Sequence, residues 1–463
     1  MKLVIDFLEK KGYNFERSDI SLKNFHAQFY VMLASQGIFT DQLCFRFIIP
    51  LSGIGVTFVG VALEALNIYR GVSTSDYYIA CESFCYLVIL GAVITVYSGF
   101  LLNKHKILTQ VEEMDADFKY VCSLGPRYRE PFLESQLLVW KLFVGWTFFI
   151  TVCGGLFMMY PITLLVYQSL LATQDKNTIR PLVFPLWLPE DDPYRTPNYE
   201  MFFVLEMYFI FTYVVSFGGY IYILFHFLLH CYIMLDMILL DFGVIFDGLD
   251  ESVTSLPKND SRRIAVQAVL KRRLRRIVNW HISVHKALKT VSSVFRMSIV
   301  YQIMLSSVVI CLIAYRISEK LDNGEIDVLF TMLGIGAVAQ LCIPCYLGTI
   351  LRNKGFAVAD ACFGCGWHET PLGPMCRVDI VTIIMRAQAP LHIRYTGQPV
   401  IQLETFSAVG TYIVVSDTPG FHLIVLLIRI EFWEVMTYDK LSLHFKSCIT
   451  MATKCKYLVF FKF

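Results

Sequence analysis

Long apolar runs alternate with shorter polar segments along this chain of 463 residues. A helix that crosses a bilayer needs roughly 20 mostly apolar residues, because the hydrocarbon core is about 30 Å thick. The runs are continuous, and backbone groups in lipid must be paired within the segment, which favours helices over strands. The pattern predicts six clear spans and a shorter seventh: Phe45–Tyr69, Tyr77–Leu102, Leu138–Tyr167, Met201–Ile233, Phe295–Tyr315, Ile326–Leu351 and Val400–Val415.

The composition narrows the class of protein further. Hydrophobic residues make up 56% of the chain and charged residues 17%, with a mean hydropathy of +0.55. Soluble domains are about a quarter charged, and a soluble fold of this length could not bury so much apolar surface. The net charge of +2 provides no strong basic field for nucleic acid. We therefore predict an all-α polytopic membrane protein that is not an enzyme and binds no nucleic acid.

Positive charge is unevenly distributed over the connecting segments. The segments on one side of the membrane contain 25 Lys and Arg residues, and those on the other side contain 6. Because cytoplasmic loops carry the excess of Lys and Arg, we predict a cytoplasmic N-terminus. Seven spans then leave the C-terminus outside. A G-protein-coupled receptor has the opposite orientation, which counts against that class.

These spans and charges predict the organisation of the chain. The longest cytoplasmic segment has apolar residues at near-helical spacing, so we expect helices that continue past the membrane into a small intracellular domain. Its basic run, Lys271-Arg-Arg-Leu-Arg-Arg276, is expected to lie near anionic lipid. The predicted parts are a cytoplasmic segment (1–44), six spans (45–351) that include the long cytoplasmic segment (232–295), a second cytoplasmic segment (352–399), a last span (400–415) and a tail (416–463).

Few residues suggest chemistry. Cys362 and Cys365, with His368 nearby, resemble half of a zinc site, but zinc usually needs two such pairs. The chain has 14 Cys, mostly in apolar runs, where a free Cys behaves as a small hydrophobic residue. Walker, Gly-x-Ser-x-Gly and His-Glu-x-x-His motifs are absent from the sequence. We predict no catalytic residue, no metal and no cofactor.

Four acidic residues lie within the predicted spans, toward the ends placed outside by the charge bias. Ionisable residues inside spans are functional by default, and one interpretation is an outer vestibule that concentrates cations. The alternative is that each carboxylate lies close enough to the interface to reach water. The four residues are Glu64, Glu82, Glu206 and Asp327.

Aromatic residues make up 15% of the chain. Some belong to the interfacial belts of a membrane protein. Others, in the outer halves of the spans, could line a closed apolar pocket for a small volatile or lipid-like ligand, although helix packing explains each of them equally well. The candidate pocket residues are Tyr78, Tyr86, Phe157, Tyr160, Tyr208, Phe211 and Phe330.

Four local sequences, in this order, resemble the insect odorant receptors, particularly those of moths. The resemblance covers roughly residues 1–409 and includes the seven spans, the cytoplasmic N-terminus and the long second cytoplasmic segment. The sequences are Phe184-Pro-Leu-Trp187-Leu-Pro189 with Pro197-Asn-Tyr199-Glu200, Ala359-Asp-Ala-Cys362 with Cys365-Gly-Trp367-His-Glu369, Met385-Arg-Ala-Gln388-Ala-Pro390-Leu, and Leu403-Glu404-Thr-Phe406-Ser-Ala-Val409.

The resemblance implies a subunit of a ligand-gated, non-selective cation channel in the plasma membrane of olfactory sensory neurons. The subunit would work with the shared odorant receptor co-receptor in a hetero-tetramer and would respond to a small volatile ligand that favours the open arrangement. The implied odorant pocket lies in the outer half of spans two to six. The implied inter-subunit anchor includes about Leu270–Phe295 and Val378–Ile393. The last span would line the pore with Leu403, Phe406 and Val409.

The chain departs from the family pattern after Val409. Family members usually continue with a Lys-Thr-Ser-Tyr-Ser-like run, whereas this chain continues with Gly410-Thr-Tyr-Ile and ends in a basic tail. We hypothesise an alternative or mis-joined final exon from about Gly410. A gustatory receptor channel is the near alternative, because Thr411-Tyr412 is similar to part of that family's last-span motif. A seven-helix G-protein-coupled receptor and a transporter are alternatives from other classes, and the sequence shows no internal repeat of the kind that transporters have.

Overall fold

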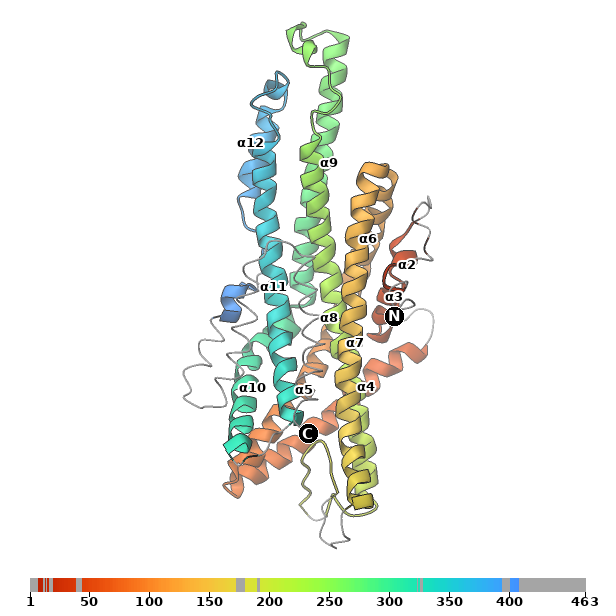
Figure 1. The fold of residues 1–463 in the computed structure, drawn as a ribbon, viewed down its shortest axis with the longest axis vertical. Helices are drawn as coiled ribbons and strands as arrows, with labels where there is room; N and C mark the ends of the chain where they lie inside the picture. Colours follow the sequence, from red (N-terminus) through yellow and green to blue (C-terminus); the bar gives the residue numbers. More distant parts are fainter. Residues whose placement is uncertain are drawn as a thin grey trace.

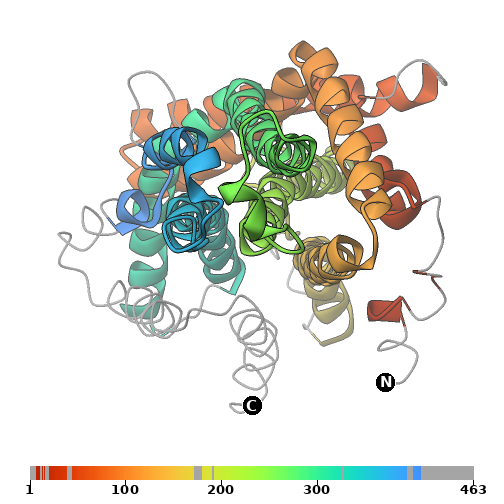
Figure 2. The same cartoon turned by 90° about the horizontal axis from the view of Figure 1, so that it is seen from above.

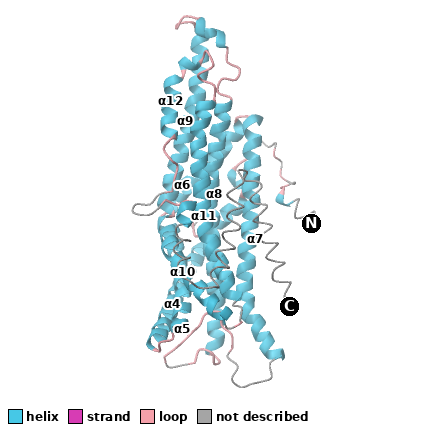
Figure 3. Ribbon diagram, turned by 60° about the vertical axis from the view of Figure 1, so that its left-hand side comes forward, coloured by secondary structure: helices cyan, strands magenta, loops and turns pink. Residues whose placement is uncertain are grey.

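The chain folds into long helices (Figure 3). The computed structural model describes residues 7–10, 13, 15, 20–38, 44–171, 180–189, 192–322, 324, 328–393 and 400–407, and these residues contain no strand. Six helices of this part are long and apolar enough to cross a membrane, so the chain is a polytopic α-helical membrane protein. They are α4 (Cys44–Ser73), α5 (Tyr77–Leu102), α7 (Pro126–Leu171), α8 (Asn198–Gly243), α10 (Arg296–Asp322) and α11 (Val328–Gly364).

Each of the six clear predicted spans overlaps one of these helices, and Tyr77–Leu102 has the bounds of α5. The other helices are longer than predicted. α7 and α8 have 46 residues each, which gives a length of about 69 Å, more than twice the thickness of the bilayer core. The structure describes only residues 400–407 of the predicted seventh span, and the predicted tail (416–463) lies outside the described residues.

Several helices are longer than a bilayer crossing requires, and they extend at one end of the bundle, the upper end in Figure 1. We call this extension the stalk (residues 234–294 and 352–393), and the opposite end of the bundle the mouth. The stalk joins the last part of α8 to α9 (Ser261–Val294) and the last part of α11 to α12 (Arg377–Ala387), with the short helices η1 (Glu251–Ser255) and η2 (Gly373–Met375) at its turns. Seen from above, α11 and α12 lie on one side of the α8–α9 pair (Figure 2).

Two residues of the basic run on α9 hold the stalk together. Arg273 donates to the carbonyl oxygens of Val244 and Ile245, at 2.9 and 2.8 Å, just beyond the end of α8. Arg276 bonds the buried carboxylate of Asp241, with 2.7 Å between its Nε and Oδ2. The expected contact with anionic lipid therefore concerns only the exposed members of the run, which are Lys271, Arg272 and Arg275.

The described part of the N-terminal segment packs against the bundle, on the side away from α11 and α12 (Figures 1 and 2). α2 (Leu22–Phe25) and α3 (Ala27–Ser35) contact α6 (Lys104–Ser123) and α8, respectively. Between them, the fully buried His26 has its Nε2 at 2.9 Å from Oε1 of Gln136, and its ring lies 4.6 Å from that of His226. Burial lowers the pKa of His26 to about 3, so this ring is neutral in the folded protein.

Candidate ligand cavity

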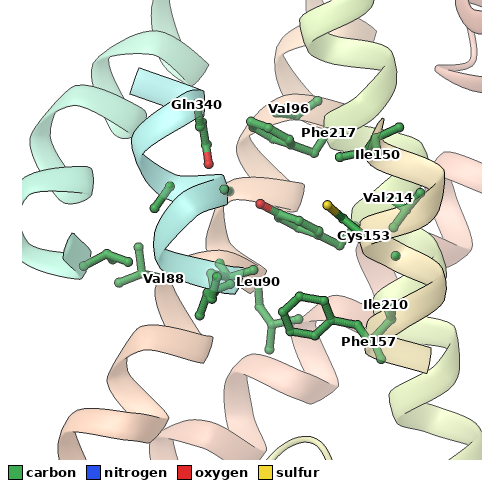
Figure 4. A pocket seen from close by; sticks show the side chains of 18 of the residues that line it. Val88, Leu90, Val96, Ile150, Cys153, Phe157, Ile210, Val214, Phe217 and Gln340 are labelled. Atoms are coloured by element: carbon green, nitrogen blue, oxygen red, sulfur yellow. The ribbon is translucent and has the colours of Figure 1, made fainter. Parts of the chain in front are cut away.

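A cavity of about 160 Å³ lies between α5, α7, α8, α10 and α11. Figure 4 shows Cys153 and Phe157 of α7 across the cavity from Val88 and Leu90 of α5, with the side chain of Gln340 of α11 directed toward it. An engineered apolar cavity of about 150 Å³ in another protein stays dry and binds benzene. The cavity thus fits a small apolar molecule of about the size of a single ring, and a larger one only if side chains rearrange.

Each helix contributes residues at helical spacing, so one face of each helix points inward. On α8, for example, Phe209, Tyr213 and Phe217 are four residues apart and form an aromatic face. The remaining lining residues are mostly aliphatic or aromatic as well. They include Tyr86, Val88, Ile89, Leu90, Val96, Trp146, Phe149, Ile150, Phe157, Ile210, Val214, Val309, Met332 and Leu333.

Several polar groups of the lining are already bonded to the protein. Gln302 of α10 accepts a hydrogen bond from the hydroxyl of Tyr220 (3.2 Å) and donates to the backbone carbonyl of Gln340. The hydroxyl of Tyr301 donates to the carbonyl oxygen of Val88 at 2.9 Å. These bonds leave a ligand to interact mainly by shape and dispersion.

A loop covers the mouth end of the cavity. The backbone N–H groups of Val183 and Phe184, which both line the cavity, donate to the carboxylate of Glu206 at 2.8 and 3.3 Å. Asn67 of α4 donates to the carbonyl oxygen of Pro185 at 3.0 Å. The described part of this loop, residues 180–189, is therefore fixed to two helices, α4 and α8, at the mouth end of the cavity.

The acidic residues singled out in the sequence are mostly engaged with other groups. Glu206 is 1% exposed and its carboxylate holds the loop, while Glu64 is 2% exposed and lies inside the bundle. Glu82 forms an ion pair with Arg316, at 2.8 Å. Asp327 lies outside the described residues.

The structure brings two of the seven candidate pocket residues, Tyr86 and Phe157, to the cavity. Phe330 lies behind Tyr86, with ring centroids 5.8 Å apart. The other four do not line it. Tyr78 lies under Arg316 at 3.6 Å, the hydroxyl of Tyr208 is 2.7 Å from that of Ser52, and Tyr160 and Phe211 are 37% and 47% exposed.

Sequence reasoning missed the polar residues of α10, although a signal was present. Ser298, Gln302 and Ser306 recur every four residues within an otherwise apolar span, which places them on one inward face. The aromatic face of α8 shows the same spacing. Such periodicity was a better guide to the cavity than aromatic content alone.

The described part of the predicted pore helix lies against α11. The backbone N–H of Leu403 donates to Oγ1 of Thr349 at 2.9 Å, and the ring of Phe406 is buried. Arg352 bonds Gln402 at 2.8 Å and Glu404 at 2.9 Å. Val409 lies outside the described residues.

The cysteines of the stalk pack within it. The buried thiol of Cys362 lies 3.7 Å from the carbonyl oxygen of Ile380, and the thiol of Cys365 is 3.2 Å from the carbonyl oxygen of Cys362. Within the described parts of the chain, no group of three or more His, Cys, Asp or Glu residues could hold a metal ion.

Comparisons with known sequences point to one family. The profile of the 7tm Odorant receptor family matches residues 79–413. Odorant receptor 82a of Drosophila melanogaster is 25% identical over 322 residues, which cover 67% of this chain and 76% of that receptor. Odorant receptors 67c (25% over 133 residues) and 45a (31% over 106 residues) of the same organism match 29% and 23% of this chain. Those two matches span only 32% and 27% of the receptors' own lengths.

Solved structures provide a match of fold. The insect olfactory receptor OR5 from Machilis hrabei superposes with a TM-score of 0.63, at 15% identity, and covers 88% of this chain and 98% of its own. The same receptor in complex with eugenol gives a TM-score of 0.62 at 13% identity. At such identities the likeness concerns the arrangement of the helices alone.

Proposed function

This chain belongs to the odorant receptor family of insects, and from that premise we propose that it is the odorant-binding subunit of a ligand-gated, non-selective cation channel. It works with the shared odorant receptor co-receptor, as a hetero-tetramer, in the plasma membrane of olfactory sensory neurons. The observation that supports a ligand-tuned subunit is the cavity of about 160 Å³ with a mainly apolar lining.

The ligand of this cavity is a small apolar volatile molecule. Apolar walls recognise it by contact area, and the few polar groups are occupied by the protein, so the best ligands carry at most one hydrogen-bonding group. Eugenol, a substituted phenol, is bound by OR5 of Machilis hrabei, which shares the fold. At about −0.3 to −1.5 kcal/mol per heavy atom, a molecule of about ten atoms binds with modest affinity.

The stalk is the inter-subunit anchor of this proposal, in the cytoplasm. Several large apolar side chains of the stalk are exposed, and apolar surface outside a membrane indicates a contact with another protein. On α11 and α12 they are Phe356, Phe363, Val378, Val381 and Met385. Four stalks that meet through such faces hold the four subunits around a common pore.

The predicted seventh span is the pore helix, with Leu403, Phe406 and Val409 along its lining. Of the four acidic residues predicted to form an outer vestibule, Glu64 and Glu206 are buried and Glu82 is paired with Arg316, so we assign these three no role in attracting cations. Binding of an odorant opens the pore only if the ligand has a higher affinity for the open arrangement than for the closed one.

Co-expression with the co-receptor tests this function. Cells that express this chain, the co-receptor or both are exposed to a panel of one-ring aromatic volatiles and to charged, non-volatile molecules of equal size, and membrane current is recorded. We expect odorant-evoked cation currents only in cells with both chains, and only for the apolar volatiles. Surface labelling of both chains without any evoked current, or a current abolished by G-protein inhibitors, would contradict the proposal.

A further inference from the structure

Pro344 interrupts the hydrogen-bond pattern of α11 just beyond the cavity. Proline has no backbone N–H, so the carbonyl four residues earlier in a helix loses its usual donor. In α11 that carbonyl belongs to Gln340, a cavity residue. Helices bend most readily at such positions, and the group that pairs the free carbonyl determines how readily α11 can change its bend.

Gln302 of α10 supplies the missing donor. Its Nε2 donates to the backbone carbonyl oxygen of Gln340 at 2.5 Å, and its Oε1 accepts from the hydroxyl of Tyr220 of α8 at 3.2 Å. The Gln302 side chain is 7% exposed, so bulk water cannot easily replace either bond. One amide thus connects three helices at the point where α11 lacks a hydrogen bond of its own.

The part of α11 beyond Pro344 contacts the segment 400–407 directly. A Cβ atom at Gly348 would lie 2.1 Å from the carbonyl oxygen of Ile401, which shows that the two backbones touch here. Next to this contact, the hydroxyl oxygen of Thr349 accepts a hydrogen bond from the backbone N–H of Leu403. A movement of this half of α11 therefore moves the segment with it.

Gln302, Pro344 and the segment 400–407 also meet at a small void. A cavity of about 10 Å³ is lined by residues of α10 and α11 together with the segment 400–407, among them Gln302, Pro344 and Ile401. Gln302 lines the large cavity as well. This side chain therefore lies between the proposed odorant site and the start of the proposed pore helix.

We propose that Pro344 is a hinge in α11 and that Gln302 is the positioning residue that sets its bend, so that odorant binding is transmitted to the segment 400–407. The proposal rests on the proposed channel function and identifies the bond that must rearrange. A ligand in the cavity displaces side chains of the α11 turn that ends at Gln340, and the change in its bond to Gln302 alters the angle at Pro344. The half of α11 beyond the hinge then carries the segment with it.

A double-substitution cycle tests the pairing. Pro344→Ala restores a backbone N–H for the carbonyl of Gln340, so the amide of Gln302 becomes dispensable. Gln302→Leu removes the donor and leaves that carbonyl unpaired, whereas the double variant pairs it again. Each variant is co-expressed with the co-receptor, and basal current, maximal current and half-maximal odorant concentration are measured per receptor at the surface.

We expect Gln302→Leu to change the ratio of basal to maximal current at least fivefold, and Pro344→Ala to lower the maximal current at least fivefold. On the Pro344→Ala background, Gln302→Leu should change either quantity less than twofold. Pro131→Ala is the control, because Pro131 also lies inside a helix, α7, but is exposed and does not line the cavity. It should change neither the half-maximal concentration nor the current ratio by more than twofold.

Equal effects of Gln302→Leu on both backgrounds, or a Pro344→Ala receptor with unaltered currents, would overturn the proposal. If Gln302→Leu does not reach the surface, recovery of surface labelling in the double variant supports the pairing, and continued absence contradicts it. Failure of the channel function itself is distinct, since the unmodified receptor would then reach the surface with the co-receptor and give no evoked current.

Discussion

Filling the cavity is expected to remove the odorant response while the fold is kept. Cys153 points into the cavity from α7, so Cys153→Phe would place a ring there (Figure 4). An empty cavity costs about 24 cal/mol per Å³. For about 160 Å³ this amounts to about 4 kcal/mol, which a ligand recovers when it fills the space. Since 1.4 kcal/mol is a factor of ten, the half-maximal odorant concentration should rise by about 10²- to 10³-fold.

The assay is the odorant dose–response of the current in cells with the co-receptor, scaled to receptor at the surface. Cys311→Phe is the matched control, because Cys311 is a partly buried cysteine of α10 that does not line the cavity. Its half-maximal concentration should stay within about threefold of the unmodified receptor. A Cys153→Phe receptor that reaches the surface and responds within the same threefold range would show that odorants bind elsewhere.

Three further predictions concern the loop, the stalk and the N-terminal segment. Glu206→Leu leaves two loop N–H groups without an acceptor, which destabilises the position of the loop by about 1–3 kcal/mol for each group. The odorant should then leave the cavity sooner, and currents should decay faster when the odorant is removed. Glu206→Gln keeps an acceptor oxygen and should behave more like the unmodified receptor. Arg276→Met leaves the buried charge of Asp241 without its ion-pair partner and should lower the free energy of unfolding by about 3–5 kcal/mol, which is measured as a lower unfolding temperature in detergent. Arg272→Met, at an exposed residue, should have no effect. Equal unfolding temperatures of the two variants would contradict this. The pKa of His26 lies at about 3, below its usual value of about 6.5, so the stability from its neutral ring is complete above pH 6.5 and is lost as the pH falls toward 3. The protection factors of the amides in residues 20–38, which are corrected for the pH dependence of intrinsic exchange, should fall between pH 7 and pH 5, and should fall less in His26→Asn.

The sequence predicted the existence of the spans well and their ends less well. The bounds of Tyr77–Leu102 were correct because polar Asp76 and Asn103 flank the apolar run and become the caps of the helix. Helix α8 ends at Gly243, ten residues beyond the predicted end of its span, because the helix continues as a partly polar stretch once it leaves the bilayer. Hydropathy detects contact with lipid, whereas a helix needs only hydrogen bonds and packing to continue.

The candidate site was predicted only in part. Tyr86 and Phe157 line the cavity, but an aromatic residue such as Phe211 is equally suited to the outer surface of a membrane helix, where lipid replaces protein as the apolar surroundings. Glu206 could not be assigned to the loop, because its partners are backbone groups about twenty residues earlier in the chain. The rotation of each helix about its axis decides these questions.

The sequence by itself determined that this protein is a helical membrane protein with at least six spans, and its ordered local motifs indicated the odorant receptor family. Both properties follow from composition and order along the chain, which do not depend on how the helices meet. Only the tertiary structure decided which faces line the cavity, that Glu206 holds the loop at its mouth end, and that Gln302 bonds the carbonyl of Gln340, which has no helical donor because of Pro344. These contacts join residues far apart in the chain, and in a bilayer, where every helix is apolar on most sides, the apolar pattern carries little information about which side faces which neighbour.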